Sequence, residues 1–268
     1  MRTRELVGRS PRLAIVAAVA VAGVLGACTS GSDGRAAPAT HEPSATTSSS
    51  PSASPSLTVT TPTSADAVVV AVPPAEWAAM VKAGVWHKGC PQSRATLRRV
   101  EVNHYGFDGA VHRGAIVVNA DVAVAVGRIF TKLFQAKFPI QQMRPIEAFA
   151  GDNQRSMAAD NTSAYNCRRD SQANSPALLS PHANGRAIDL NPLHNPWMDP
   201  RCTCWSPSKR FAARVAAPGI VVKAGPAWRI FIAEGWVWQD IGVPDYMHFD
   251  TGYPTRPVTG RPTPSPPR

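Results

Sequence analysis

The sequence lacks any run of lysine and arginine, although its formal net charge is +10 at pH 7. Its basic side chains occur singly or in isolated pairs and without interleaved aromatic residues, so the charge pattern does not favour nucleic-acid binding. A basic protein that leaves the cytoplasm is better suited to anionic polymers and membrane surfaces. We also find no internal repeat, which leaves one ordinary globular domain as the simplest organisation.

No apolar run is long enough for a membrane-spanning helix. The longest covers about 15 residues, 13–27, whereas a spanning helix needs roughly 20. It follows four arginines and ends in Gly26-Ala27-Cys28, small residues before a cysteine. This pattern predicts an export signal over residues 1–27. The ending resembles the lipobox of bacterial lipoproteins, which implies that Cys28 is acylated; the alternative is an ordinary signal peptide with an incidental cysteine.

Large apolar side chains are scarce after the signal. Residues 29–64 are mostly Ser, Thr, Pro, Ala and Gly, a composition that cannot bury enough surface to fold. We therefore predict a disordered tether over residues 28–73 and a Pro-rich tail over residues 253–268. Residues 74–252 remain as one globular domain, long enough to hold a full hydrophobic core.

Cysteine is also scarce, with five in the chain. Apart from Cys28 they are Cys90, Cys167, Cys202 and Cys204. Four thiols in an oxidising compartment usually pair, and three connectivities are possible. The alternative is a thiolate zinc site built on the Cys202-Thr-Cys204 pair, but a lone C-x-C motif is weak support for one.

Regular elements are short and mixed. The pattern predicts helices and strands without a repeated βαβ unit, which favours an α+β fold around a small, largely antiparallel sheet flanked by helices. The expected helices cover residues 76–83, 120–138 (with Asn119 as N-cap) and 227–234. The expected strands cover residues 98–105, 114–118, 143–150, 187–191, 236–239 and 247–250, with a polar loop from 151 to 166.

The metal motifs H-x-H and H-E-x-x-H are absent, which excludes lysostaphin-like and thermolysin-like zinc sites. Instead, residues 180–189 read S-x-H-x-x-G-x-A-x-D, and residues 245–248 read D-x-x-H. The small residues Gly185 and Ala187 would let a turn bearing a histidine pack against the strand that follows it. We therefore expect the two motifs to meet in one site.

The two motifs contain a possible zinc site. The two histidines His182 and His248, with Asp189, form a three-ligand set that leaves the fourth tetrahedral position open for water. Zinc lowers the pKa of such a water and polarises a carbonyl group. Asp245, three residues before His248, is placed to act as general base and then as general acid.

Together these motifs resemble the D-alanyl-D-alanine carboxypeptidase-like zinc peptidases, which include the vancomycin-resistance D,D-peptidases and the L-alanyl-D-glutamate endolysins. Residues 89–91, 161–168 and 189–196 resemble an exported subgroup, so the resemblance covers most of residues 85–250. It implies a D,D-peptidase/hedgehog-like fold. It also implies hydrolysis of peptidoglycan stem peptides by a metal-activated water, as a D,D-carboxypeptidase or an L-Ala-D-Glu-type endopeptidase.

Carried over by position, the resemblance makes His182, Asp189 and His248 the zinc ligands. It makes Asp245 the acid/base residue, at a place where many members have Glu. Members of the family also use an arginine to hold the substrate or the oxyanion, and Arg168 is our candidate.

Two further assignments come from the resemblance. Arg144 and Arg155 are the alternatives to Arg168 as the substrate-binding arginine. The family-like settings of Cys90 and Cys167 imply a disulfide between them, which leaves the other two cysteines paired to each other or reduced.

Two other functions fit the sequence less well. The S-x-x-K of Ser206 and Lys209 matches serine penicillin-binding enzymes, but about 13 residues separate it from the K-A-G of Lys223, too few for the intervening domain. A non-catalytic wall-binding lipoprotein on a peptidase scaffold should have lost a ligand or the acid/base, and all are present. We therefore expect a monomer on the outer face of the cell membrane. It would be bound to the membrane by lipid, act on stem peptides, and have no nucleic-acid partner.

Overall fold

The computed structural model describes residues 62–168, 180–239 and 242–252. The expected signal peptide, Cys28, most of the tether and the Pro-rich tail lie outside these ranges, so their assignments stay predictions. All described residues belong to one compact unit, Leu57–Arg268. None of the helices in the described ranges is both long enough and apolar enough to cross a bilayer.

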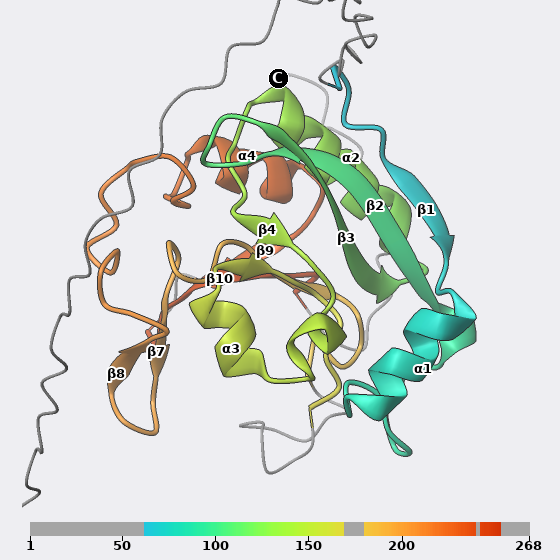
Figure 1. Cartoon of the computed structure of the whole chain (residues 1–268). Helices are drawn as coiled ribbons and strands as arrows, with labels where there is room; N and C mark the ends of the chain where they lie inside the picture. Colours follow the sequence, from blue (N-terminus) through green and yellow to red (C-terminus); the bar gives the residue numbers. More distant parts are fainter. Residues whose placement is uncertain (1–61, 169–179, 240–241, 253–268) are drawn as a thin grey trace, which may run out of the picture. The chain divides into compact units, whose positions relative to one another are not determined.

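The first sheet confirms the strands expected over residues 98–105 and 114–118 and joins them in a β-hairpin. Strand β2 (Leu97–Tyr105) pairs antiparallel with β3 (Val111–Asn119) through the turn between them. Strand β1 (Val68–Ala71) adds to the other edge of β2, giving the order β1-β2-β3 (Figure 1). The boundary that we set for the tether at residue 73 is therefore wrong. An exposed edge strand shows no alternation of buried and exposed side chains, so its short valine run resembled linker sequence.

The second sheet carries the motif residues. The strand order is β6-β10-β7-β8, and β9 also pairs with β10, at Asp245, Phe249 and Asp250. The strands are β6 (Ala187–Asp189), β7 (Trp197–Asp199), β8 (Cys204–Ser206), β9 (Val237–Gln239) and β10 (Asp245–Asp250). The β7–β8 hairpin was not expected from the sequence. A short parallel pair, β4 (Gln142–Met143) with β5 (Asn161–Thr162), completes the strands of the described ranges.

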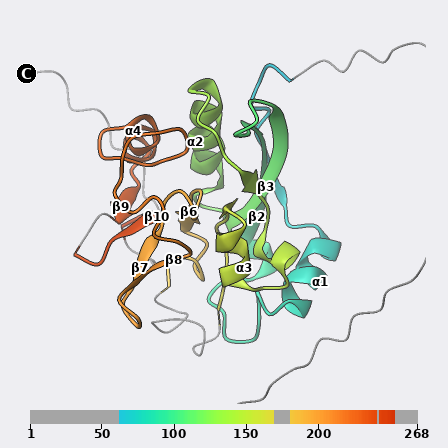
Figure 2. The same ribbon diagram turned by 60° about the vertical axis from the view of Figure 1, so that its left-hand side comes forward.

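Helix α2 (Ala123–Gln135) supplies the core that both sheets share. Its buried Ile129, Phe130 and Leu133 lie in one cluster with Ile188 of β6 and Phe249 of β10. Figure 2 shows α2 between strands β2 and β3 on one side and α4 (Pro226–Ala233) on the other. Burying each large apolar side chain stabilises the fold by about 1.5–3 kcal/mol. This mixture of helices and antiparallel sheets confirms the expected α+β class.

Two local predictions near the core are wrong. Asn119 is the last residue of β3 and does not cap α2, whose N-cap is Val122. Its side-chain amide instead donates to the carbonyl oxygen of Asn184 at 3.1 Å. The strand expected over residues 143–150 ends at Met143, because Pro145 has no backbone N–H for a ladder.

The segment from 146 to 166 is more regular than a loop. A 3₁₀ turn (Ile146–Phe149) is followed by α3 (Asn153–Ala158). The side chain of Asp152 caps α3 by accepting the backbone N–H of Arg155 at 3.1 Å. Helix α1 (Pro74–Lys82) agrees with the helix expected there.

Candidate metal centre

The three candidate ligands come from a turn and two paired strands. Asp189 ends β6, and His248 lies directly opposite it in the antiparallel register of β10. His182 precedes β6 in a turn that contains Gly185, which has a φ of +67°. A Cβ on Gly185 would meet the backbone nitrogen of Asn119 at 2.6 Å. Glycine is therefore required where this turn packs against the end of β3.

The ligand atoms of these three residues form a nearly regular triangle. His182 Nε2 lies 3.1 Å from His248 Nδ1 and 3.2 Å from Asp189 Oδ1, and His248 Nδ1 lies 3.3 Å from Asp189 Oδ1. Tetrahedral ligands at zinc distances are separated by roughly 3.3 Å. All three residues are more than nine-tenths buried. The triangle thus has the dimensions of one face of a metal tetrahedron, and the group could hold a metal ion.

In each histidine, the ring nitrogen that is not part of the triangle (the outer nitrogen) already has a partner. His182 Nδ1 lies 2.7 Å from the carbonyl oxygen of Ala164, to which it can donate. His248 Nε2 lies 3.1 Å from Asp250 Oδ2, which also accepts from Gln239 Nε2 at 2.8 Å. Donation by the outer nitrogen leaves the inner nitrogen with a lone pair for a metal. Sequence reasoning missed Asp250, although its spacing of two residues from His248 on a strand places both on one face.

The charges within the site favour a bound cation. Burial opposes ionisation of Asp189, but His182 and His248 lower its pKa well below the usual range. Burial also disfavours the charged ring of His248, yet its hydrogen bonds to Asp189 and Asp250 raise its pKa to about 10. A metal ion bound at the triangle would compete with the proton of His248, because a metal ligand must be unprotonated at the atom that binds the metal.

Asp245 lies beside the triangle because β10 is irregular. Residues three apart on a regular strand point to opposite faces, but the pairing of β10 with β9 changes register between Asp245 and Phe249. Asp245 and His248 consequently line the same cavity. Asp245 Oδ1 is buried and has no hydrogen-bond partner among the described residues. Burial raises the pKa of Asp245 to about 6, a value that suits a group that accepts and returns a proton near neutral pH.

The cavity at the triangle has a volume of about 160 Å³ and also contains Arg168. The two alternative arginines do not line it within the described ranges. Arg144 lies over the ring of Phe149 at 5.6 Å, and Arg155 is on α3. The structure thus brings Arg168 to the cavity, and its contact with substrate stays a prediction.

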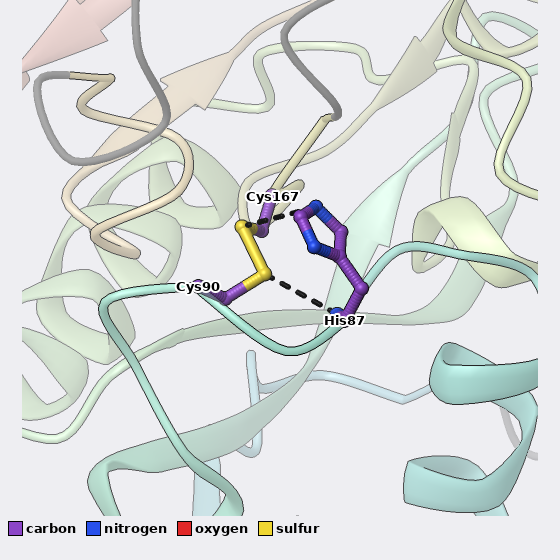
Figure 3. Close-up of side chains that lie close together, drawn as sticks. All are labelled: His87, Cys90 and Cys167. Carbon is purple, nitrogen blue, oxygen red and sulfur yellow. Dashed lines mark hydrogen bonds between the residues drawn. A yellow bond between two sulfur atoms is a disulfide. The ribbon is translucent and has the colours of Figure 1, made fainter.

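Both pairs of cysteines form disulfides. Cys90 is joined to Cys167, as expected, and Cys202 to Cys204. Figure 3 shows His87 against the first bridge, with its Nε2 3.9 Å from Cys167 Sγ. These three residues have the composition of a metal site, but the joined sulfurs cannot act as thiolate ligands. The bridge instead attaches the segment after α1 to the residue next to Arg168.

His194 belongs to the structural framework. Its ring lies between Phe107 and Phe211, at centroid distances of 4.4 and 4.5 Å. Its Nδ1 lies 2.5 Å from Asp160 Oδ2, and Asp160 Oδ1 accepts the backbone N–H groups of Leu193 and His194.

A family model described as D-alanyl-D-alanine carboxypeptidase matches residues 173–251. The matched segment contains His182, Asp189, Asp245 and His248, the four residues gathered in the cavity. Comparison with curated proteins gave no match, and neither did comparison with solved structures. Residues 173–251, which carry the ligand triangle, are therefore similar to the D-alanyl-D-alanine carboxypeptidase family of peptidases.

Proposed function

We propose that the protein is a zinc-dependent peptidase that hydrolyses peptide bonds in the stem peptides of peptidoglycan. The bond would be a terminal D-Ala linkage or an L-Ala-D-Glu-type linkage. The observation that carries the proposal is the buried triangle of His182 Nε2, Asp189 Oδ1 and His248 Nδ1, with sides of 3.1–3.3 Å. The family match supports the peptidase class.

The donor set suits zinc. Two imidazole nitrogens and one carboxylate oxygen are the ligands of many catalytic zinc sites, which keep a fourth position open. The three residues would hold the ion through the atoms of the triangle. When bound, zinc supplies a Lewis acid that polarises the scissile carbonyl and makes water nucleophilic near neutral pH.

The protein's own groups would perform the proton transfers and hold the substrate. Asp245 Oδ1, which is buried and without a partner among the described residues, would accept the proton of the attacking water. The same oxygen would then return the proton to the leaving amine. Arg168, in the same cavity, would donate to a substrate carboxylate or to the oxyanion that develops on the scissile carbonyl.

The proposal includes a place in the cell envelope. The lipobox-like ending at Cys28 supports a lipid anchor on the outer face of the membrane, and the Ser/Thr/Pro-rich residues after it support a flexible tether. A tether of 40-odd residues has a root-mean-square reach of roughly 35–40 Å. Cys28→Ser should release the protein from membranes or leave it unprocessed, as fractionation would show.

The decisive experiment combines metal analysis with digestion of purified muropeptides. We expect one zinc per chain and new peptide fragments in the mass spectra, with the fragment masses identifying the bond. The same digestion by Asp245→Asn serves as the control for contaminating peptidases. Wall binding without cleavage by the zinc-loaded protein would instead indicate a non-catalytic scaffold.

A further inference from the structure

A second cavity adjoins the cavity that contains the ligand triangle. Its volume is about 490 Å³, whereas that of the cavity at the triangle is about 160 Å³. The two cavities share Asn153, Arg168 and Trp197 in their linings, so they lie side by side. A substrate held at the triangle can therefore extend into the larger cavity, which has the size of a typical ligand site.

The larger cavity lies between α3 and the β7–β8 hairpin, which are neighbours in Figures 1 and 2. Ser206 Oγ of β8 donates to Gln154 Oε1 of α3 at 3.3 Å, which joins the two walls. The turn of the hairpin carries Arg201, and the disulfide between Cys202 and Cys204 closes it. The hairpin therefore forms one side of the cavity and is held to α3 by this hydrogen bond.

Arg201 is held in one orientation by Asp199. Its Nε donates to Asp199 Oδ1 at 2.9 Å, and its Nη2 donates to Oδ2 at 2.6 Å. The same Oδ1 accepts the backbone N–H of Arg201 at 2.9 Å. Asp199 is itself buried, whereas the side chain of Arg201 is 57 % exposed. A guanidinium has five N–H groups, so Nη1 and one Nη2 hydrogen stay available to a ligand.

The lining offers guanidinium N–H groups that can donate to an anion, although the charge of Arg201 is balanced by Asp199. Arg168 and Arg201 contribute two guanidinium groups. The carboxylate in the lining belongs to Asp152, which already caps α3. A planar guanidinium that is fixed in advance binds a planar carboxylate with little loss of side-chain entropy.

We propose that the larger cavity binds a second carboxylate of the substrate, at a residue away from the scissile bond, and that Arg201 is the residue that recognises it. The protein would then select acidic peptides over the same peptides with that carboxylate amidated. This inference rests on the proposed function, because it places the scissile bond at the triangle.

The test measures the affinity of two matched stem peptides by calorimetry. They differ in one group: the free carboxylate of D-glutamate in the first is a carboxamide in the second. The zinc-loaded full chain with Asp245→Asn is used, so that neither peptide is consumed. We expect the acidic peptide to bind about tenfold more tightly, as one charge-assisted hydrogen-bonded contact allows. Adding Arg201→Gln should reduce this ratio to below about twofold.

Arg229→Gln is the matched control, because it removes the same charge from an exposed position on α4. It should keep the tenfold ratio. Equal affinities in the parent protein, binding of neither peptide, or an unchanged ratio in Arg201→Gln would each overturn the inference. Failure of the proposed function is a separate result, because it appears as absence of cleavage by the wild-type protein and not as a change in this ratio.

Discussion

His248 Nδ1 lies 3.3 Å from Asp189 Oδ1 because the two residues are direct partners in the antiparallel ladder of β10 and β6. Side chains of directly opposite residues start about 4.5–5.5 Å apart at Cβ, so the ladder itself brings their ends together. His182 completes the triangle from a turn whose backbone bonds to itself and to Asn119. The fold therefore holds the three candidate ligand atoms close together.

Removing one ligand should abolish metal binding. We expect His182→Ala to lose stoichiometric zinc and peptide cleavage together, since two remaining ligands hold zinc poorly. Elemental analysis after dialysis measures the first effect, and the muropeptide digestion measures the second. His112→Ala is the control, because this exposed histidine pairs with Asp108 away from the site. One zinc per chain in His182→Ala would contradict the ligand assignment.

Removing the proposed base should separate binding from turnover. Asp245→Asn keeps the size of the side chain but cannot take a proton, so we expect kcat to fall by about 100- to 10,000-fold. Zinc content should stay at one per chain, because Asp245 is not a member of the triangle. A kcat close to that of the wild-type protein would show that another group transfers the proton.

Asp250 should control metal affinity without touching the metal. Asp250→Ala removes the acceptor that orients the His248 ring, so zinc should bind about 10- to 100-fold more weakly. Competition with a chelator gives the affinity. Asp108→Ala is a matched control, because it breaks another Asp–His pair at an exposed position. Equal zinc affinities in the two variants would mean that the outer partner of His248 has no effect.

The two disulfides should differ in their effect on stability. The bridge from Cys90 to Cys167 spans 77 residues, and that from Cys202 to Cys204 spans 2. Closing the longer loop limits the unfolded chain more. Loss of the bridge from Cys90 to Cys167 should therefore lower the free energy of unfolding by about 4 kcal/mol, and loss of the bridge from Cys202 to Cys204 should lower it by less than about 2 kcal/mol. Urea denaturation of the two double Cys→Ser variants tests this order. A larger loss for the short bridge would contradict it.

Glu147 should make the protein less stable as the pH rises. Burial, with nearby Glu76, raises the pKa of Glu147 to about 7 from 4.5. The folded state then binds more protons than the unfolded state between these values, so the free energy of unfolding falls from pH 4.5 to pH 7. Glu147→Gln should thus be more stable than wild type at pH 8, by roughly 1–2 kcal/mol, and lose this advantage at pH 4.

Glu101→Gln should behave in the opposite way. A hydrogen bond from Arg99 lowers the pKa of Glu101, so its contribution is present near neutral pH and is lost as the pH falls. Urea denaturation midpoints of Glu147→Gln and Glu101→Gln between about pH 4 and pH 8 measure how the stability of each variant, relative to wild type, changes with pH. A pH-independent difference between Glu147→Gln and wild type would show that the carboxyl does not titrate as described.

Local patterns in the sequence determined several elements and the composition of the site. Helix α2 and the β2–β3 hairpin follow from apolar spacing and turn residues within about 20 positions. The candidate ligands His182, Asp189 and His248, with Asp245, could also be identified from the sequence, because two histidines and a carboxylate have few roles as a set.

The tertiary structure decided what depends on contacts between distant segments. His182 and His248 are 66 residues apart, and only the shared core under β6 and β10 brings them together. The register change that turns Asp245 into the cavity depends on pairing with β9. Sequence alone also left three arginines open, and the fold brought Arg168 to the cavity. Periodicity reports which face of an element is apolar, whereas packing decides which faces meet.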